Sequence, residues 1–325
     1  MRYWRLVAVG GGVAIGLIVG SALSLIYCPQ LLERMRSTLS TIEAAKTWEA
    51  IKDFGNSAFV VAVIGSLAGA FAGAYGGYMI VEKGKRRDEL LKEIRNTNAA
   101  TMVAFGICNA LLSTKQKLIK PLKEKYDAQK AAFSEHVHGK TSGEIGPDVG
   151  FEFQADFETV NLPPLAVDIL QSQVFEKLSL VGRPLLLVTT LRQALYTLEH
   201  AMVTRNDLIQ SYKLQSPLPT NLLIHLYFGL PYGGGHVNQD YPASLEAMYE
   251  LTDSAIFFSH LLCGDLGEHG DHLAAEFKQK FGSGAPTIAK PDFKKAEDAK
   301  LMPSADSFAD WLGMFVKKPN ATTVD

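Results

Sequence analysis

Two stretches of this chain of 325 residues carry no charged side chain, and they constrain its fold more than any other feature. They are residues 6–27 and residues 58–81. A helix rises about 1.5 Å per residue, so each stretch would be about 33–36 Å long, enough to cross the hydrocarbon core of a bilayer. We therefore expect a two-helix transmembrane hairpin. For the first stretch, a cleaved signal peptide ending near Gly20, Ser21 and Ala22 is the alternative.

Small residues recur at every fourth position in both stretches. Glycine costs a helix about 0.8–1.0 kcal/mol relative to alanine, so its repeated use needs a reason. Small side chains at this spacing let two helix backbones approach closely. We therefore predict helix packing through Gly12, Gly16, Gly20, Gly65, Gly69, Gly73 and Gly77.

The partner of each glycine stripe is open. The two stripes either meet within one chain or meet copies from other chains. A second register of small residues in the later stretch favours a homo-oligomer, because it lets that helix contact two neighbours. This register consists of Ala62, Ser66, Ala70 and Ala74.

Basic residues near the ends of the two stretches predict the orientation of the hairpin. Residues 28–57 balance their basic and acidic side chains, whereas basic residues crowd behind the second stretch. Those basic residues are Lys83, Lys85, Arg86, Arg87, Lys92 and Arg95. Because cytoplasmic flanks carry the excess of Lys and Arg, we expect a bacterial inner-membrane protein with both termini in the cytoplasm. Residues 28–57 would then be a periplasmic connector, either an amphipathic helix or a plain structural link.

The remainder of the chain is predicted to be helical. The apolar run at residues 99–112 is too short to span a bilayer and is typical of a buried bundle helix. Pro184 opens a long helical pattern, at a position that proline favours. Residues 151–162 alternate as a strand would, without an obvious partner strand. We therefore expect an all-α fold, with a helical cytoplasmic domain at residues 82–282.

One cluster of potential metal ligands lies in the sequence HLLCGDLGEHGDH. The candidate ligands are His260, Cys263, His269 and His272. His and Cys side chains three residues apart can surround zinc or another transition metal. The alternative is a polar turn that breaks the helix at its glycines, because neither HExxH nor paired CxxC is present.

A second candidate site is the glycine-rich loop at residues 230–242. Three consecutive glycines before His236 could cradle an anion, but the lysine of a phosphate loop is missing. A flexible loop between helices is the alternative.

No GxSxG elbow places a serine nucleophile, and the sequence favours a protein that is not an enzyme. We expect no cofactor, and no nucleic-acid partner because no basic patch is interleaved with aromatic residues.

The C-terminal region, residues 283–325, is predicted to be a flexible linker that ends in a short amphipathic helix. One face of this helix carries Phe308, Trp311, Leu312 and Phe315. Ser304 is placed to cap its start. A helix of about 13 residues is marginal alone, so this face must dock. Its docking site is the chain's own helical domain, a groove on a cytoplasmic protein partner, or the inner leaflet.

The order of the segments GGGVAIGLIVG, GSLAGAFAGAYGG and KGKRRDELLKEIR resembles the two-transmembrane effector proteins of bacterial anti-phage systems. The resemblance covers the first third of the chain and is architectural. It implies a glycine-striped hairpin in front of a helical cytosolic sensor. We therefore expect an integral inner-membrane protein that binds a partner, oligomerises or permeabilises the membrane. The alternative is a membrane-tethered enzyme or a metal- or ligand-binding domain centred on residues 230–272.

Overall fold

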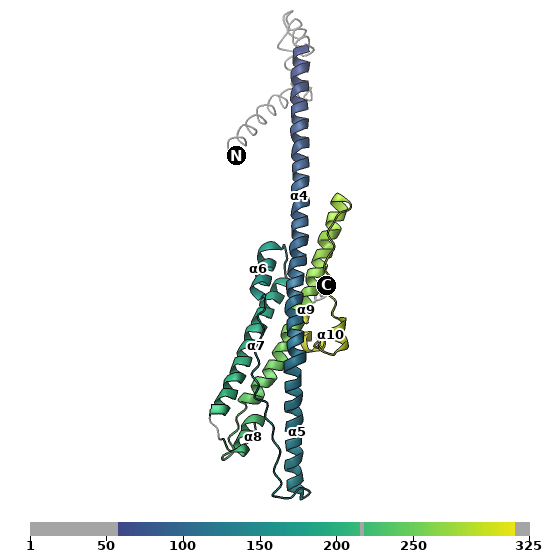
Figure 1. Cartoon of the computed structure of the whole chain (residues 1–325). Helices are drawn as coiled ribbons and strands as arrows, with labels where there is room; N and C mark the ends of the chain where they lie inside the picture. The colour runs from purple at the N-terminus through teal and green to yellow at the C-terminus, as the bar shows by residue number, and fades with distance from the viewer. Residues whose placement is uncertain (1–57, 215–217, 316–325) are drawn as a thin grey trace, which may run out of the picture. The chain divides into compact units, whose positions relative to one another are not determined.

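The computed structural model describes residues 58–214 and 218–315 (Figure 1). Over these residues the chain is helical and forms no β-strand. It divides into two compact units, residues 1–83 and residues 84–325. The described helical elements are α4 (Ala58–Thr114), η1 (Lys115–Ile119), α5 (Lys120–Ser142), α6 (Val167–Lys177), α7 (Arg183–Leu214), α8 (Thr220–Phe228), α9 (Asp240–Phe281), α10 (Lys294–Asp298), η2 (Ala305–Phe308) and α11 (Ala309–Gly313).

The predicted transmembrane hairpin is overturned. Within residues 58–214 and 218–315, no helix is both long and apolar enough to cross a bilayer. Residues 58–81 begin α4, but Gly, Ala, Ser and Tyr fill most positions from 65 to 78. The Gly, Ala and Ser side chains add little hydrophobic transfer energy, at about 0.8 kcal/mol per buried CH₂, and burying a tyrosine hydroxyl in hydrocarbon is costly. This finding also overturns the predicted inner-membrane location, the orientation of the termini and the function as an integral membrane effector.

Two further predictions for the N-terminal part lie outside the described residues. They are the first span at residues 6–27, with Gly12, Gly16 and Gly20, and the connector at residues 28–57.

Three long helical segments lie side by side in the unit that begins at residue 84 (Figure 1). They are α4 continued by η1 and α5, then α7, and then α9. One continuous cluster of buried apolar side chains joins them, and the helical bundle in the prediction agrees with this architecture. The cluster includes Ile107 and Leu111 of α4, Leu191 and Leu198 of α7, and Ile256 and Leu262 of α9.

The junction between α4 and α5 is a π-helical turn. Pro121 lies inside this continuous helical segment, where proline cannot donate a backbone hydrogen bond, and the chain widens into η1 just before it. In this turn Lys115 is buried, with 4% of its side chain exposed. It forms an ion pair with Asp253 of α9 and donates a hydrogen bond to the carbonyl oxygen of Leu301 at 3.0 Å. This contact ties the C-terminal region to the bundle.

The segment that alternates like a strand, residues 151–162, is extended but pairs with no described strand. Side chains of α7 hold its backbone instead. Asn206 accepts a hydrogen bond from the N–H of Val160 at 3.1 Å and donates one to its carbonyl oxygen at 2.9 Å. The fully buried Arg205 donates to the carbonyl oxygen of Glu158 at 2.7 Å. Residues 151–162 therefore form what we call the strap, a segment without strand pairing whose backbone is held by side chains of α7.

Candidate functional site

The sequence GDLGEHG lies inside α9, which is unbroken, so the predicted helix-breaking turn does not form. Its three glycines are three residues apart and share one side of the helix. A Cβ atom at Gly270 would lie 2.8 Å from Cγ2 of Ile288, so glycine lets the C-terminal segment cross α9 closely. At Gly264 and Gly267, nothing lies within 4 Å of the Cβ position. These two positions leave open space on the helix surface.

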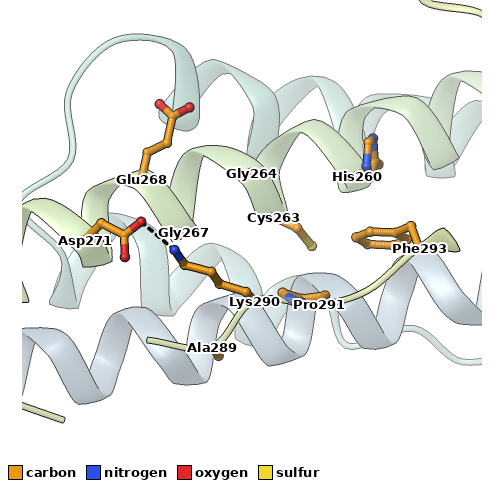
Figure 2. Close-up of a pocket in the computed structure, with 10 residues that line it drawn as sticks. All are labelled: His260, Cys263, Gly264, Gly267, Glu268, Asp271, Ala289, Lys290, Pro291 and Phe293. Carbon is orange, nitrogen blue, oxygen red and sulfur yellow. Dashed lines mark ion pairs between the residues drawn. The ribbon is translucent and has the colours of Figure 1, made fainter. Parts of the chain in front are cut away.

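A pocket of about 280 Å³ occupies this space (Figure 2). Its lining comes from α9 on one side and from residues 289–293 on the other. The rings of His260 and Phe293 meet edge to face, with centroids 4.6 Å apart. At the other end, Nζ of Lys290 lies 2.9 Å from Oδ2 of Asp271. The pocket is slightly smaller than typical small-molecule sites of about 300–1,000 Å³.

The two titratable groups deepest in the pocket are uncharged at neutral pH. Burial lowers the pKa of His260 below its ordinary value, although the nearby Glu297 acts in the opposite direction. Burial also raises the pKa of the Cys263 thiol to about 12, and the neighbouring Cys108 adds to this. A thiol is nucleophilic only as the thiolate, so the pocket offers no activated cysteine.

The four predicted metal ligands do not lie close together. His260 and Cys263 line the pocket, whereas His269 lies on the opposite side of α9, with Nε2 3.3 Å from Oε1 of Glu93. His272 is exposed. In the part of the chain that the structure describes, no group of three or more His, Cys, Asp or Glu side chains could hold a metal ion.

Serine, histidine and glutamate side chains do meet where α4, α9 and the connection between α6 and α7 come together. Glu93 accepts hydrogen bonds from the backbone N–H and the hydroxyl of Ser179, and it also faces His269. A nucleophilic triad needs histidine between the hydroxyl and the carboxylate. Here the carboxylate is in the middle, so the cluster holds helices together and lacks a base for the serine.

The glycine-rich loop at residues 230–242 closes on itself. The N–H of Tyr232 donates to the carbonyl oxygen of His236 at 2.8 Å, and the N–H of His236 donates back at 2.9 Å. Gly233, Gly234 and Gly235 adopt φ values of 49°, 87° and 97°, which glycine tolerates best. The N–H of Gly235 also bonds within the loop. Two amides that an anion cradle would need, those of Gly235 and His236, are thus engaged inside the loop.

The structure places the predicted C-terminal docking face on the chain's own helical domain. The ring of Phe308 stacks on Phe257 of α9 with centroids 3.9 Å apart, and Trp311 packs against Phe258 at 5.1 Å. Leu312 is partly buried against the same core, and Phe315 contacts Trp311. The hydroxyl of Ser304 accepts a hydrogen bond from the N–H of Asp306 at 3.3 Å, as expected of a cap. The helix is split into η2 and α11 and is shorter than predicted.

The N-terminal part of α4 presents a different surface. Its large side chains at every fourth position form an apolar ridge, and they are 40–67% exposed. The ridge consists of Val63, Leu67, Phe71, Tyr75 and Met79. The predicted glycine stripe lies on the same helix, and nothing is within 4 Å of the Cβ position at any of its members. The stripe consists of Gly65, Gly69, Gly73 and Gly77.

Two features of the site escaped prediction. The pocket floor at Gly264 and Gly267 has a signal in the sequence, because three glycines spaced by three fall on one helix face. The other is Asn98 of α4, which donates to the carbonyl oxygen of Thr287 at 2.8 Å and accepts from the N–H of Ala289 at 2.9 Å. Asn98 thereby fixes the segment that closes the pocket, and no local sequence pattern predicts this contact.

No protein family, curated protein or solved structure matches this chain. The resemblance to two-transmembrane effector proteins is therefore not tested by comparison.

Proposed function

We propose that this chain assembles with further copies of itself through residues 62–81 of α4. The observation that carries the proposal is the apolar ridge. Soluble monomers rarely expose contiguous apolar patches beyond a few hundred Å², and larger patches mark interaction surfaces. Five large apolar side chains in one helical register, all at least 40% exposed, form such a patch.

The area of this surface fits an interface between proteins. Tyr78, three residues beyond Tyr75, adjoins the ridge and is 62% exposed. Taking about 100 Å² for each half-exposed large side chain, the six residues present on the order of 600 Å². Each partner in the smaller stable protein–protein interfaces contributes about 600 Å². The surface is therefore large enough for stable association.

Sedimentation velocity of the full chain, over a wide range of concentrations, tests the proposal. We expect the unsubstituted chain to sediment as an oligomer and the double substitution Leu67→Ser with Phe71→Ser to sediment as a monomer. Tyr196→Ser on α7 is the matched control, because Tyr196 is an exposed aromatic residue, 70% accessible, outside the ridge. It should leave the oligomer intact.

Three results would contradict the proposal. One is a monomer at every concentration for the unsubstituted chain. Another is an oligomer that survives the ridge substitutions. The third is flotation of the monomer with phospholipid vesicles, because the ridge would then be a lipid-binding surface.

A further inference from the structure

The ridge and the glycine stripe face in opposite directions. Successive residues of a helix are about 100° apart around its axis, so positions two residues apart are about 160° apart. Val63 and Gly65, Leu67 and Gly69, and each following pair keep this relation. From Val63 to Gly77, one side of the helix therefore projects large side chains and the other side carries glycine.

The glycine side is smooth and has no polar group to satisfy. Next to the glycines lie Ala62, Ser66, Ala70 and Ala74, all exposed and small. The only polar side chain among them is Ser66, and its hydroxyl donates to the carbonyl oxygen of Val63 at 2.9 Å. A neighbouring helix can approach this side closely without burying an unpaired donor or acceptor.

The two surfaces match in spacing. Both repeat every four residues, so the ridge of one helix fits along the glycine stripe of an identical, parallel helix. We infer that copies of this chain associate ridge to glycine stripe, head to tail. This inference rests on the proposed self-association and names the geometry of the contact.

Two-fold symmetric pairing of two copies would bury either the ridges or the glycine stripes, but not both. Pairing stripe to stripe leaves five large apolar side chains exposed. Pairing ridge to ridge leaves four glycines with no close contact, although each costs about 0.8–1.0 kcal/mol relative to alanine. Ridge-to-stripe contact uses both surfaces of every copy. Because such a contact is heterologous, each added copy leaves one ridge and one stripe open for a further copy.

A mixing experiment with two variants of the full chain tests the geometry. The ridge variant, Leu67→Ser with Phe71→Ser, keeps its glycine stripe. The stripe variant, Gly69→Leu with Gly73→Leu, keeps its ridge. Each alone should sediment as a monomer. An equal mixture should form dimers and nothing larger, because one intact ridge meets one intact stripe and the remaining surfaces are both defective.

Other outcomes separate the two proposals. A monomeric unsubstituted chain contradicts the self-association itself. An oligomeric unsubstituted chain whose two variants do not combine contradicts only the head-to-tail geometry. Gly106→Leu is the control for adding leucine to a helix, because Gly106 is exposed on α4 with nothing within 4 Å of its Cβ position. Circular dichroism should show equal helicity in all variants.

Cysteine cross-linking gives a second measurement that needs no loss of association. A mixture of chains carrying Phe71→Cys with chains carrying Gly73→Cys should form a disulfide-linked pair under mild oxidation. Chains with Phe71→Cys alone should not cross-link beyond the background of the native chain. Efficient cross-linking of Phe71→Cys chains with one another would show ridge-to-ridge pairing and overturn the inference.

Discussion

Gly270 of α9 lies directly beneath Ile288, and a Cβ atom at Gly270 would be 2.8 Å from Cγ2 of Ile288. Gly264 and Gly267, on the same side of the helix, have no atom within 4 Å of that position. The same residue type therefore has two roles within seven residues. At Gly270 it allows a crossing, and at the other two positions it leaves a pocket.

Alanine at these glycines should separate the two roles. Gly264→Ala and Gly267→Ala should each stabilise the protein by about 0.5–1 kcal/mol, because alanine lowers the entropy cost of the helix and meets no neighbour. Gly270→Ala should instead destabilise it, because Ile288 must move. Urea denaturation of the three variants measures these changes. Equal effects at all three positions would show that Ile288 does not press on Gly270.

Removing the Phe308 side chain should loosen the C-terminal region. Phe308→Ala removes the ring stacked on Phe257 and should cost about 2 kcal/mol, less than a fully buried aromatic residue. Met314→Ala is the control, because Met314 is 64% exposed. Thermal unfolding should show a lower midpoint for Phe308→Ala only. An unchanged midpoint for both variants would mean that the docked face contributes no stability.

The ion pair between Lys115 and Asp253 should make stability depend on pH once it is broken. Burial raises the pKa of Asp253 above its ordinary value, and Lys115 opposes that rise. In Lys115→Met the pKa of Asp253 should rise further. A raised pKa in the folded state favours folding at low pH, and this benefit is lost as pH rises through that pKa.

The cost of Lys115→Met should therefore be larger at neutral than at acidic pH. At about pH 7 the lone buried carboxylate should cost about 3–5 kcal/mol. At about pH 4 the carboxyl group should be largely protonated, so most of that cost should disappear. Urea denaturation of the variant and the unsubstituted chain at both pH values measures the difference. The same cost at both pH values would exclude ionised Asp253 as its source.

The Cys263 thiol should resist alkylation in the folded protein. Its pKa of about 12 leaves very little thiolate near pH 8, and the residue is 3% exposed. Iodoacetamide should label this residue rapidly in urea and at least a hundredfold more slowly in the folded state, as followed by peptide mass spectrometry. Rapid labelling of the folded protein would show that the pocket opens to solvent at this residue.

The sequence predicts the helices well where apolar residues repeat over many turns. The buried run at 99–112 and the helix that begins near Pro184 are found as expected, because tertiary packing and local preference agree there. The cap at Ser304 is another local signal that the structure shows.

The sequence does not show what a helical glycine does. Glycines 264 to 270 suggested a break, yet they lie inside the continuous helix α9. The meaning of a helical glycine depends on what approaches it, and that partner comes from elsewhere in the chain or from another molecule. Periodicity along the sequence does not identify it.

The strap and the pocket could not be predicted for a similar reason. Asn206 holds Val160, and Asn98 holds Thr287 and Ala289, from distant parts of the chain. The sequence around an asparagine on a helix does not show which distant backbone groups its side chain will bind. Asn98 helps to fix the segment that forms one side of the pocket.

If the apolar ridge of α4 joins copies of this chain, the mass of the protein in solution must exceed that of one chain. Light scattering during size-exclusion chromatography measures this mass independently of shape. We expect the mass of an oligomer larger than a dimer, and we expect it to fall to that of a single chain in Leu67→Ser with Phe71→Ser. A single-chain mass for the unsubstituted protein at every concentration would show that the ridge does not join copies.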